Sequence, residues 1–148
     1  MNSQTKTDNE IQVVIGRLRS WARALEAGKL EVLEDVLADD FVATCYDCNP
    51  KFFCLALRKA DFIELDRHVT NSTIDFKGIW GERLGDMVMT RAIATVTETF
   101  TGNLGPHLPT AEEMTKSLSG KTRAFASGWR LYDGIWRCFN HHAFGVVG

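Results

Sequence analysis

Three polar side chains have the types that acid–base chemistry needs: His142, Glu98 and Tyr46. An imidazole changes charge near neutral pH, a buried carboxyl group titrates above its usual range, and a tyrosine hydroxyl donates to a ligand oxygen. Each residue also has a structural interpretation: a hydrogen-bonded histidine at a strand end, an exposed acid near the end of a hairpin, and a packed tyrosine with its hydroxyl at the surface. Both interpretations stay open.

The last segment of the chain predicts how His142 is presented. Residues 121–132 and 135–144 are predicted to pair as a hairpin across an Asp-Gly turn. Because side chains alternate across a strand, one face of the second strand carries Trp136, Cys138, Asn140 and His142. The other face carries Arg137, Phe139, His141 and Ala143. Tryptophan and cysteine suit burial, so we expect the first face to line a ligand pocket near Tyr46. The second face should meet a dimer partner or solvent.

The four cysteines raise the question of a metal or redox site. A structural zinc site needs four ligands at a recognisable spacing. The spacing of Cys54, Cys138 and the Cys45-x-x-Cys48 pair matches no such motif. A thioredoxin-like motif opens a helix, whereas Asn49-Pro50 favours a turn here. We therefore expect free thiols, no metal and no cofactor. Glycine-rich phosphate loops, His-Glu-x-x-His and Gly-x-Ser-x-Gly motifs are also missing from the sequence.

Composition narrows the class of protein. The chain has 148 residues, 45% of them hydrophobic and 24% charged, which is typical of one globular domain spanning 1–148. A formal net charge of −2 provides no basic field for nucleic acid or an anionic membrane. No apolar run reaches the roughly 18 residues of a membrane-spanning helix. The polar start of the chain lacks the core of a secretory signal, so we expect a cytoplasmic protein.

The N-terminal half predicts helices. Apolar residues recur at spacings of three and four from Ile11 to Leu25, and Gly28 suits the end of this first helix. The segment Thr7-Asp8-Asn9-Glu10 matches a capping box, which leaves residues 1–7 as a disordered tail. A second, shorter helix presents Leu30, Leu33 and Leu37 on one side. A third is predicted from about 56 to 68, with a solvated face that carries Asp61, Asp66 and His68.

Strands dominate the rest of the chain. We predict them at residues 41–46, 73–80 and 86–101 and in the closing hairpin. Strict alternation places Ile74, Phe76, Gly78 and Trp80 on one face of the second of these strands. On the third, Glu98 shares a face with Ala94, Val96 and Phe100. Residues 102–120 read as an irregular loop or a short helix, with Thr110-Ala111-Glu112-Glu113 able to cap it.

Segregated helices and strands favour an α+β fold. A strongly curved, antiparallel or mixed sheet wrapped around the N-terminal helices would leave an internal pocket. The segments Leu37-Ala38-Asp39-Asp40-Phe41, Tyr46-Asp47, and Asp133-Gly134-Ile135-Trp136-Arg137 through His142 resemble the NTF2-like superfamily. Within it they resemble the SnoaL-like and DUF4440 group of small cone-shaped proteins, and the resemblance covers residues 8 to 145.

This resemblance implies a homodimer with a pocket between sheet and helices in each subunit. Relatives include isomerases and cyclases that use a pocket carboxylate as base, dehydratases, and many binding or scaffolding members. We therefore expect a protein that binds a small apolar or carbonyl-bearing molecule. Two alternatives stay open: an isomerase, cyclase or dehydratase acting by proton transfer, and a non-catalytic dimeric scaffold. No residue of the sequence matches the general base of the enzymes securely.

Overall fold

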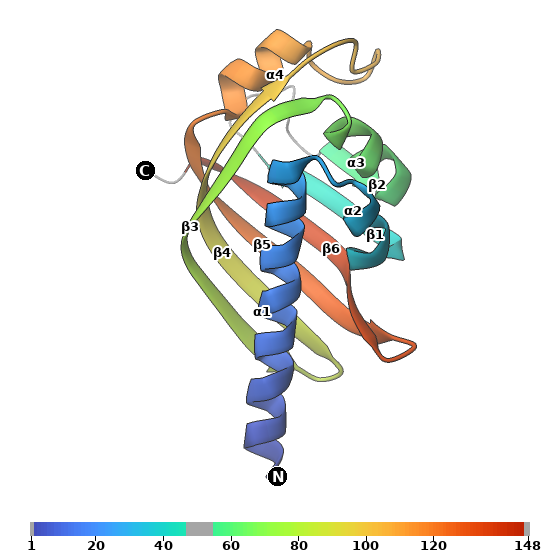
Figure 1. Ribbon diagram of the computed structural model, residues 1–148, viewed down its shortest axis with the longest axis vertical. Helices are drawn as coiled ribbons and strands as arrows, with labels where there is room; N and C mark the ends of the chain where they lie inside the picture. Colours follow the sequence, from blue (N-terminus) through green and yellow to red (C-terminus); the bar gives the residue numbers. More distant parts are fainter. Residues whose placement is uncertain (1, 47–54, 147–148) are drawn as a thin grey trace.

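The computed structural model describes residues 2–46 and 55–146. In chain order the elements are α1 (Ser3–Ala27), α2 (Glu31–Val36), β1 (Leu37–Tyr46), β2 (Leu55–Arg58), α3 (Lys59–Asp66), β3 (Val69–Leu84), β4 (Met87–Phe100), α4 (Ala111–Leu118), β5 (Lys121–Tyr132) and β6 (Ile135–Val146). The strands form one sheet in the order β2-β1-β6-β5-β4-β3, with β1 and β6 parallel and the other pairs antiparallel. The sheet curves around α1, which crosses one of its faces (Figure 1). The predicted α+β fold is confirmed.

Helix α1 begins earlier than its sequence pattern predicts. The Asn2 side chain accepts a hydrogen bond from the Thr5 backbone N–H at 2.8 Å and so caps the helix before Ser3. The capping box expected at Thr7 is therefore wrong, and so is the disordered tail over residues 1–7, because residues from Ser3 onward are helical. The other end is as predicted: Gly28 has φ +70°, a left-handed conformation that glycine adopts without strain.

The boundary between helix and sheet differs from prediction at two places. Strand β1 starts at Leu37 rather than at residue 41, because Leu37 already pairs with Cys138 of β6. The helix predicted from about 56 to 68 is only α3, since residues 55–58 pair antiparallel with β1 as β2. In both cases pairing with a neighbouring strand outweighs the local helical pattern.

A β-bulge in β6 changes which side chains face α1. Trp129 of β5 pairs with Cys138, whereas the preceding residue, Gly128, pairs with Asn140. Phe139 is therefore an extra residue, and the alternation of side chains reverses after it. Gly128 leaves room for this bulge, because a Cβ there would lie 2.6 Å from Asn140 Oδ1 and 2.9 Å from Phe139 Cζ.

A second bulge, at Lys77, does the same to β3. Phe76 pairs with Ala94, and Gly78 pairs with Ile93, so Lys77 has no partner of its own on β4. Phe76 packs against the core, but Trp80 lies on the opposite face and is 50% exposed. The prediction that Ile74, Phe76, Gly78 and Trp80 share one face is therefore wrong beyond Phe76.

The closing hairpin and the segment before it match prediction. Asp133 and Gly134 both have positive φ, which suits a tight turn between twisted strands. Thr110 and Glu113 form the predicted capping box of α4, and Met114 and Leu118 pack beside Phe100. Helix α4 lies at the end of the sheet opposite the 133–134 turn (Figure 1). Among the described residues, no helix combines the length and apolar character that crossing a membrane requires.

Candidate functional site

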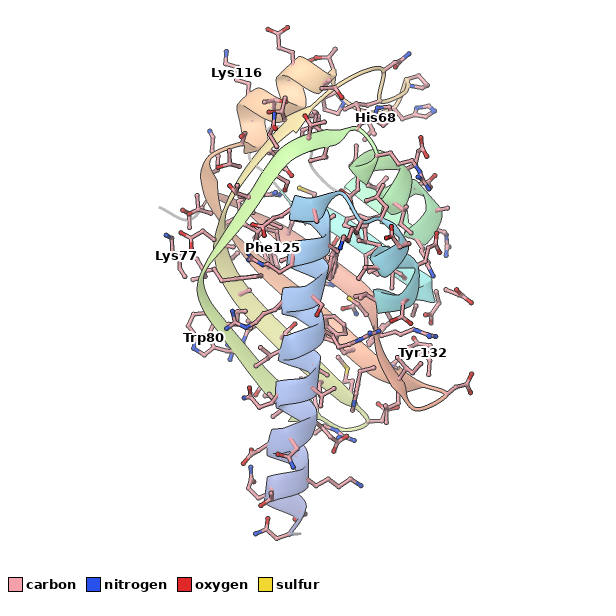
Figure 2. The ribbon with its side chains drawn as sticks, in the orientation of Figure 1. His68, Lys77, Trp80, Lys116, Phe125 and Tyr132 are labelled. Atoms are coloured by element: carbon pink, nitrogen blue, oxygen red, sulfur yellow. The ribbon has the colours of Figure 1, made fainter. Side chains whose placement is uncertain are left out.

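A pocket of about 180 Å³ lies between the concave face of the sheet and helices α1 and α3. Its walls are mostly apolar, with Trp21 and Leu25 from α1, Phe62 from α3, and Val96 and Phe125 from the sheet. Figure 2 shows Phe125 next to α1. A cavity of about 150 Å³ with apolar walls is large enough to bind benzene, so this pocket has room for a small aromatic or alicyclic group.

Small residues on the concave face create this pocket. Inward positions of three strands carry alanines: Ala43 of β1, Ala92 and Ala94 of β4, and Ala143 of β6. Trp21 of α1 lines the pocket on the side where it packs against Phe41. The pocket is therefore open because the side chains at these positions are small. The bulges contribute to the curvature of the sheet around it.

Asp66, Glu98 and Arg123 give the pocket its charged groups. Asp66 ends α3, Glu98 faces inward from β4, and Arg123 faces inward from β5 with only 6% of its surface exposed. Arg123 Nη2 donates to Cys45 Sγ at 3.3 Å, and the guanidinium lies 5.4 Å from the centre of the Phe125 ring. Three charged side chains from separate elements thus meet in an otherwise apolar hollow.

Several buried polar atoms of this pocket have no hydrogen-bond partner among residues 2–46 and 55–146. They are Trp21 Nε1, Arg123 Nε and Asp66 Oδ2. Leaving a buried polar group unsatisfied costs about 1–3 kcal/mol, and such groups in folded proteins call for an explanation. All three belong to side chains that line the pocket.

Burial shifts both acids towards their protonated, uncharged form. Burial raises the pKa of Asp66 well above its usual value, and the nearby charge of Glu98 raises it further. Burial also raises the pKa of Glu98, while the Arg123 charge lowers it. Protonation of one or both acids relieves the cost of burying two negative charges together.

The acids also line a second hollow of about 110 Å³. This smaller hollow lies where α1 and α3 end, and Gly28, Arg67 and Ser72 form part of its wall. Asp66 and Glu98 are therefore accessible from both hollows, and they separate the apolar pocket from a more polar one.

His141, rather than His142, faces the pocket. Its ring stacks on Phe125 with centroids 5.6 Å apart, and its Nδ1 hydrogen-bonds with Ser127 Oγ at 2.7 Å. Burial, with smaller contributions from the charges of Arg123 and His142, lowers the pKa of His141 to about 3. The imidazole is therefore neutral at ordinary pH and contributes a polar but uncharged surface.

The structure divides the predicted site residues into three groups. Glu98 lies in the pocket, on the side predicted from its alternation with Val96. Trp136 and Cys138 face inward as predicted, but they belong to the core beneath α1 and do not line the pocket. The side chain of Tyr46 lies outside the described residues, as do Cys48 and Cys54.

For Asn140 and His142 the predicted face is wrong, because the bulge at Phe139 turns both away from the pocket. Asn140 Oδ1 accepts a hydrogen bond from the Gly128 N–H at 2.8 Å, and His142 Nδ1 hydrogen-bonds with Thr44 Oγ1. His141 and Ala143 take the inward positions instead.

Two members of the charged cluster were not singled out from sequence. Asp66 was expected on a solvated helix face, but the shorter α3 ends at this residue and one of its carboxyl oxygens is buried. Arg123 does carry a usable signal, because it is in phase with Phe125, Ser127 and Trp129 along β5. A charge on the buried face of a strand points to a site or a buried ion pair.

The curved sheet, the crossing helix and the pocket between them define an α+β cone. No family model and no curated protein matches the sequence. Solved structures do, and they show that the chain has the NTF2-like fold. An NTF2-like protein from Cytophaga hutchinsonii is 14% identical with a TM-score of 0.71, and the match covers 99% of this chain and 100% of that one.

Two further structures support the same assignment. An NTF2-like protein of unknown function from Rhodospirillum rubrum is 20% identical with a TM-score of 0.65, covering 93% of this chain and 98% of that one. A proposed dehydratase of the NTF2-like family from Streptomyces avermitilis is 16% identical with a TM-score of 0.67, covering 95% and 99%. At such identities the likeness shows the fold alone, and membership of the SnoaL-like and DUF4440 group stays a prediction.

The raised pKa of Asp66 makes stability depend on pH in a direction that can be tested. Between the ordinary carboxyl pKa of about 4 and the raised one, the folded protein holds a proton that the unfolded chain releases. Stability should therefore fall as pH rises through this window, by up to about 1.4 kcal/mol per pH unit for one proton. The isosteric change Asp66→Asn should remove this contribution.

Urea unfolding at a series of pH values from 4 to 8 measures the difference between Asp66→Asn and the wild type. The lowered pKa of His141 gives the opposite slope below about pH 6.5, but it acts in both proteins and cancels. The matched control is Asp61→Asn, on the exposed face of the same helix. A variant difference that does not change with pH would contradict a protonated Asp66.

Proposed function

We propose that this protein binds a small apolar or carbonyl-bearing molecule in the pocket beneath α1. The observation that carries the proposal is the presence of two buried N–H groups, Trp21 Nε1 and Arg123 Nε, without partners in an apolar hollow. Ligand sites commonly combine apolar walls with a few convergent polar groups that set orientation. An oxygen of the ligand would satisfy these donors, and its apolar part would fill the space between Phe62 and Phe125.

Thermal unfolding with acetophenone, which has an aromatic ring and one carbonyl, tests this proposal. A ligand that binds only the folded state stabilises it by about 2.7 kcal/mol at one hundred times its dissociation constant, so the unfolding temperature should rise with acetophenone concentration. In Ala94→Phe the new ring occupies the pocket, and the rise should disappear. Thr97→Phe adds the same ring to an exposed position of the same strand and should behave like the wild type.

Circular dichroism must show that Ala94→Phe is folded, since overpacking costs about 1–3 kcal/mol. The smaller change Ala94→Val provides a second variant, with partial loss expected. A ligand-binding role would be contradicted if the unfolding temperature of the wild type did not respond to acetophenone, ethylbenzene, phenylacetate, phenylacetamide or phenethylamine.

A second candidate function is proton-transfer catalysis: isomerisation, cyclisation or dehydration. The observation that favours it is the pair of buried acids, Asp66 and Glu98, facing a mostly apolar pocket. Two carboxyl groups that lie close together lose their protons in two separate steps, so that over a range of pH one is protonated while the other is ionised. The ionised acid would remove a proton from a carbon of the substrate. The protonated acid or Arg123 would donate a hydrogen bond to the oxyanion that develops on the substrate. The proposed dehydratase activity of the Streptomyces avermitilis protein is of this class.

Deuterium exchange tests the catalytic function without knowledge of the natural substrate. Phenylacetone in deuterated buffer loses its α-protons slowly, and proton NMR follows the rate. The protein should accelerate this exchange with a bell-shaped pH profile, and Asp66→Asn and Glu98→Gln should each reduce the acceleration by about 10²- to 10⁴-fold. Binding of phenylacetone without acceleration above buffer would rule out this chemistry and leave the binding function intact.

We also propose that two copies associate through the outer face of the sheet. The outer face is the face of the sheet opposite α1. Trp80 is 50% exposed on it, and Phe144 is 42% exposed. Ile93 lies on the same face, on a strand between those of Trp80 and Phe144. Exposed apolar side chains gathered on one sheet face are typical of an interface. A dimeric scaffold without catalysis would use the same surface.

Sedimentation velocity tests the dimer. The wild type should sediment at twice the chain mass of 16.6 kDa, and Ile93→Glu should shift it to the monomer. Val13 is 54% exposed on α1, away from the outer face, so Val13→Glu should leave the dimer unchanged. A monomeric wild type at micromolar concentration would contradict the proposal.

A further inference from the structure

Arg123 is a buried cation with no carboxylate of the described residues within salt-bridge distance, unlike Arg17 and Arg83. Arg17 lies 2.8 Å from Asp35, and Arg83 lies 2.6 Å from Glu10. Arg123 is more deeply buried than either, yet no carboxylate of the described residues lies within salt-bridge distance of its guanidinium. A buried charge is costly unless it is paired at close range. The charges of Glu98 and Arg123 interact but form no close ion pair, so the pocket contains a cation with room for a closer negative partner.

Several of the groups that line the pocket with Arg123 are donors. Trp21 Nε1–H and Arg123 Nε–H are both buried and unsatisfied within the described chain. Asp66 and Glu98, whose pKa values burial raises, can each donate as carboxylic acids. A ligand group made of acceptors satisfies such a set, whereas an ammonium group would face Arg123 and more donors.

We propose that the pocket takes a small aromatic or alicyclic carboxylate, with the carboxylate on Arg123 and its second oxygen towards Asp66 and Glu98. Arginine is suited to this role because its planar fork of N–H groups matches the two oxygens of a carboxylate. The pocket volume of about 180 Å³ suits a ring of six carbons with a short acidic side chain. This inference rests on the proposed binding function and specifies its ligand class.

Binding of the anion should be coupled to uptake of a proton. The groups that face Arg123 are Asp66 from α3, Glu98 from β4, Cys45 from β1 and His141 from β6, and α1 contributes only uncharged side chains. His141 is neutral, so the charge balance depends on the two acids. A ligand carboxylate replaces one ionised acid as the counter-charge of Arg123 and favours its protonation. The second hollow also reaches both acids, from the side away from the apolar pocket.

Isothermal titration calorimetry with three probes of similar shape tests the ligand class. Phenylacetate is the anion, phenylacetamide is its neutral isostere, and phenethylamine is the cation. At pH 6 phenylacetate should bind at least tenfold more tightly than phenylacetamide, and phenethylamine should bind most weakly. The phenylacetate affinity should fall as pH rises from 6 to 8. Titrations in buffers of different ionisation enthalpy should show net proton uptake.

Arg123→Gln should weaken phenylacetate binding at least tenfold and phenylacetamide binding clearly less, because the amide loses a hydrogen bond to a neutral oxygen whereas the anion also loses its ion pair. Arg130→Gln is the matched control, because Arg130 lies on the same strand but faces outward and stacks on Phe139 at 4.0 Å. If Arg123→Gln does not fold, the comparison of the three probes on the wild type decides alone.

The outcomes separate this inference from the proposed function. Equal affinity for phenylacetate and phenylacetamide, or a preference for phenethylamine, would overturn the carboxylate assignment and leave ligand binding standing. An undiminished affinity of Arg123→Gln for phenylacetate would also overturn it. If acetophenone, ethylbenzene and all three probes fail to bind, the proposed function fails and the ligand class fails with it.

Discussion

The packing of Trp21 against the sheet is the contact on which the pocket depends. Its indole meets Phe41 and Trp129 edge to face, with ring centroids 6.3 and 6.4 Å away, and so fixes α1 over the concave surface. On one side of Trp21 large side chains fill the core. On the other side alanines such as Ala92 and Ala94 face the helix. The aromatic contact fixes the distance between α1 and the sheet. The alanine side chains are too small to fill that distance, so the space between the alanines and the helix stays open.

That open space changes the energetics of the charged groups within it. In water Asp66, Glu98 and Arg123 would carry their ordinary charges at little cost. In an apolar hollow each ionised group loses hydration, and this raises the pKa of both acids. Arg123 cannot respond in this way, because a guanidinium does not lose its proton in proteins. The folded chain therefore retains one fixed charge and two adjustable ones, and an anionic ligand would lower the free energy of all three together.

How far the site could be predicted depends on β-bulges. Glu98 was placed correctly because no register shift interrupts the pairing of β4 with β5, so strict alternation applies along that strand. The same rule misplaced Asn140 and His142, because Phe139 is an extra residue in β6. It misplaced Trp80 for the same reason, through Lys77 of β3. A bulge depends on pairing with strands distant in the sequence. The glycines beside these two bulges, Gly78 and Gly128, are a general signal that does not show which residue is the extra one.

Asp66 shows a different limit of sequence reasoning. The helical pattern around it was correct in kind, and a charged residue among other charges normally faces solvent. Asp66 is the last residue of α3 and lines the pocket, where one of its carboxyl oxygens is buried. The local pattern of charges does not show which side of the helix end meets the sheet. The polar cluster also has no compact motif, because its members come from α3, β4 and β5. A charge at an inward position of a strand, as at Arg123, is then the most direct local indication that such a site exists.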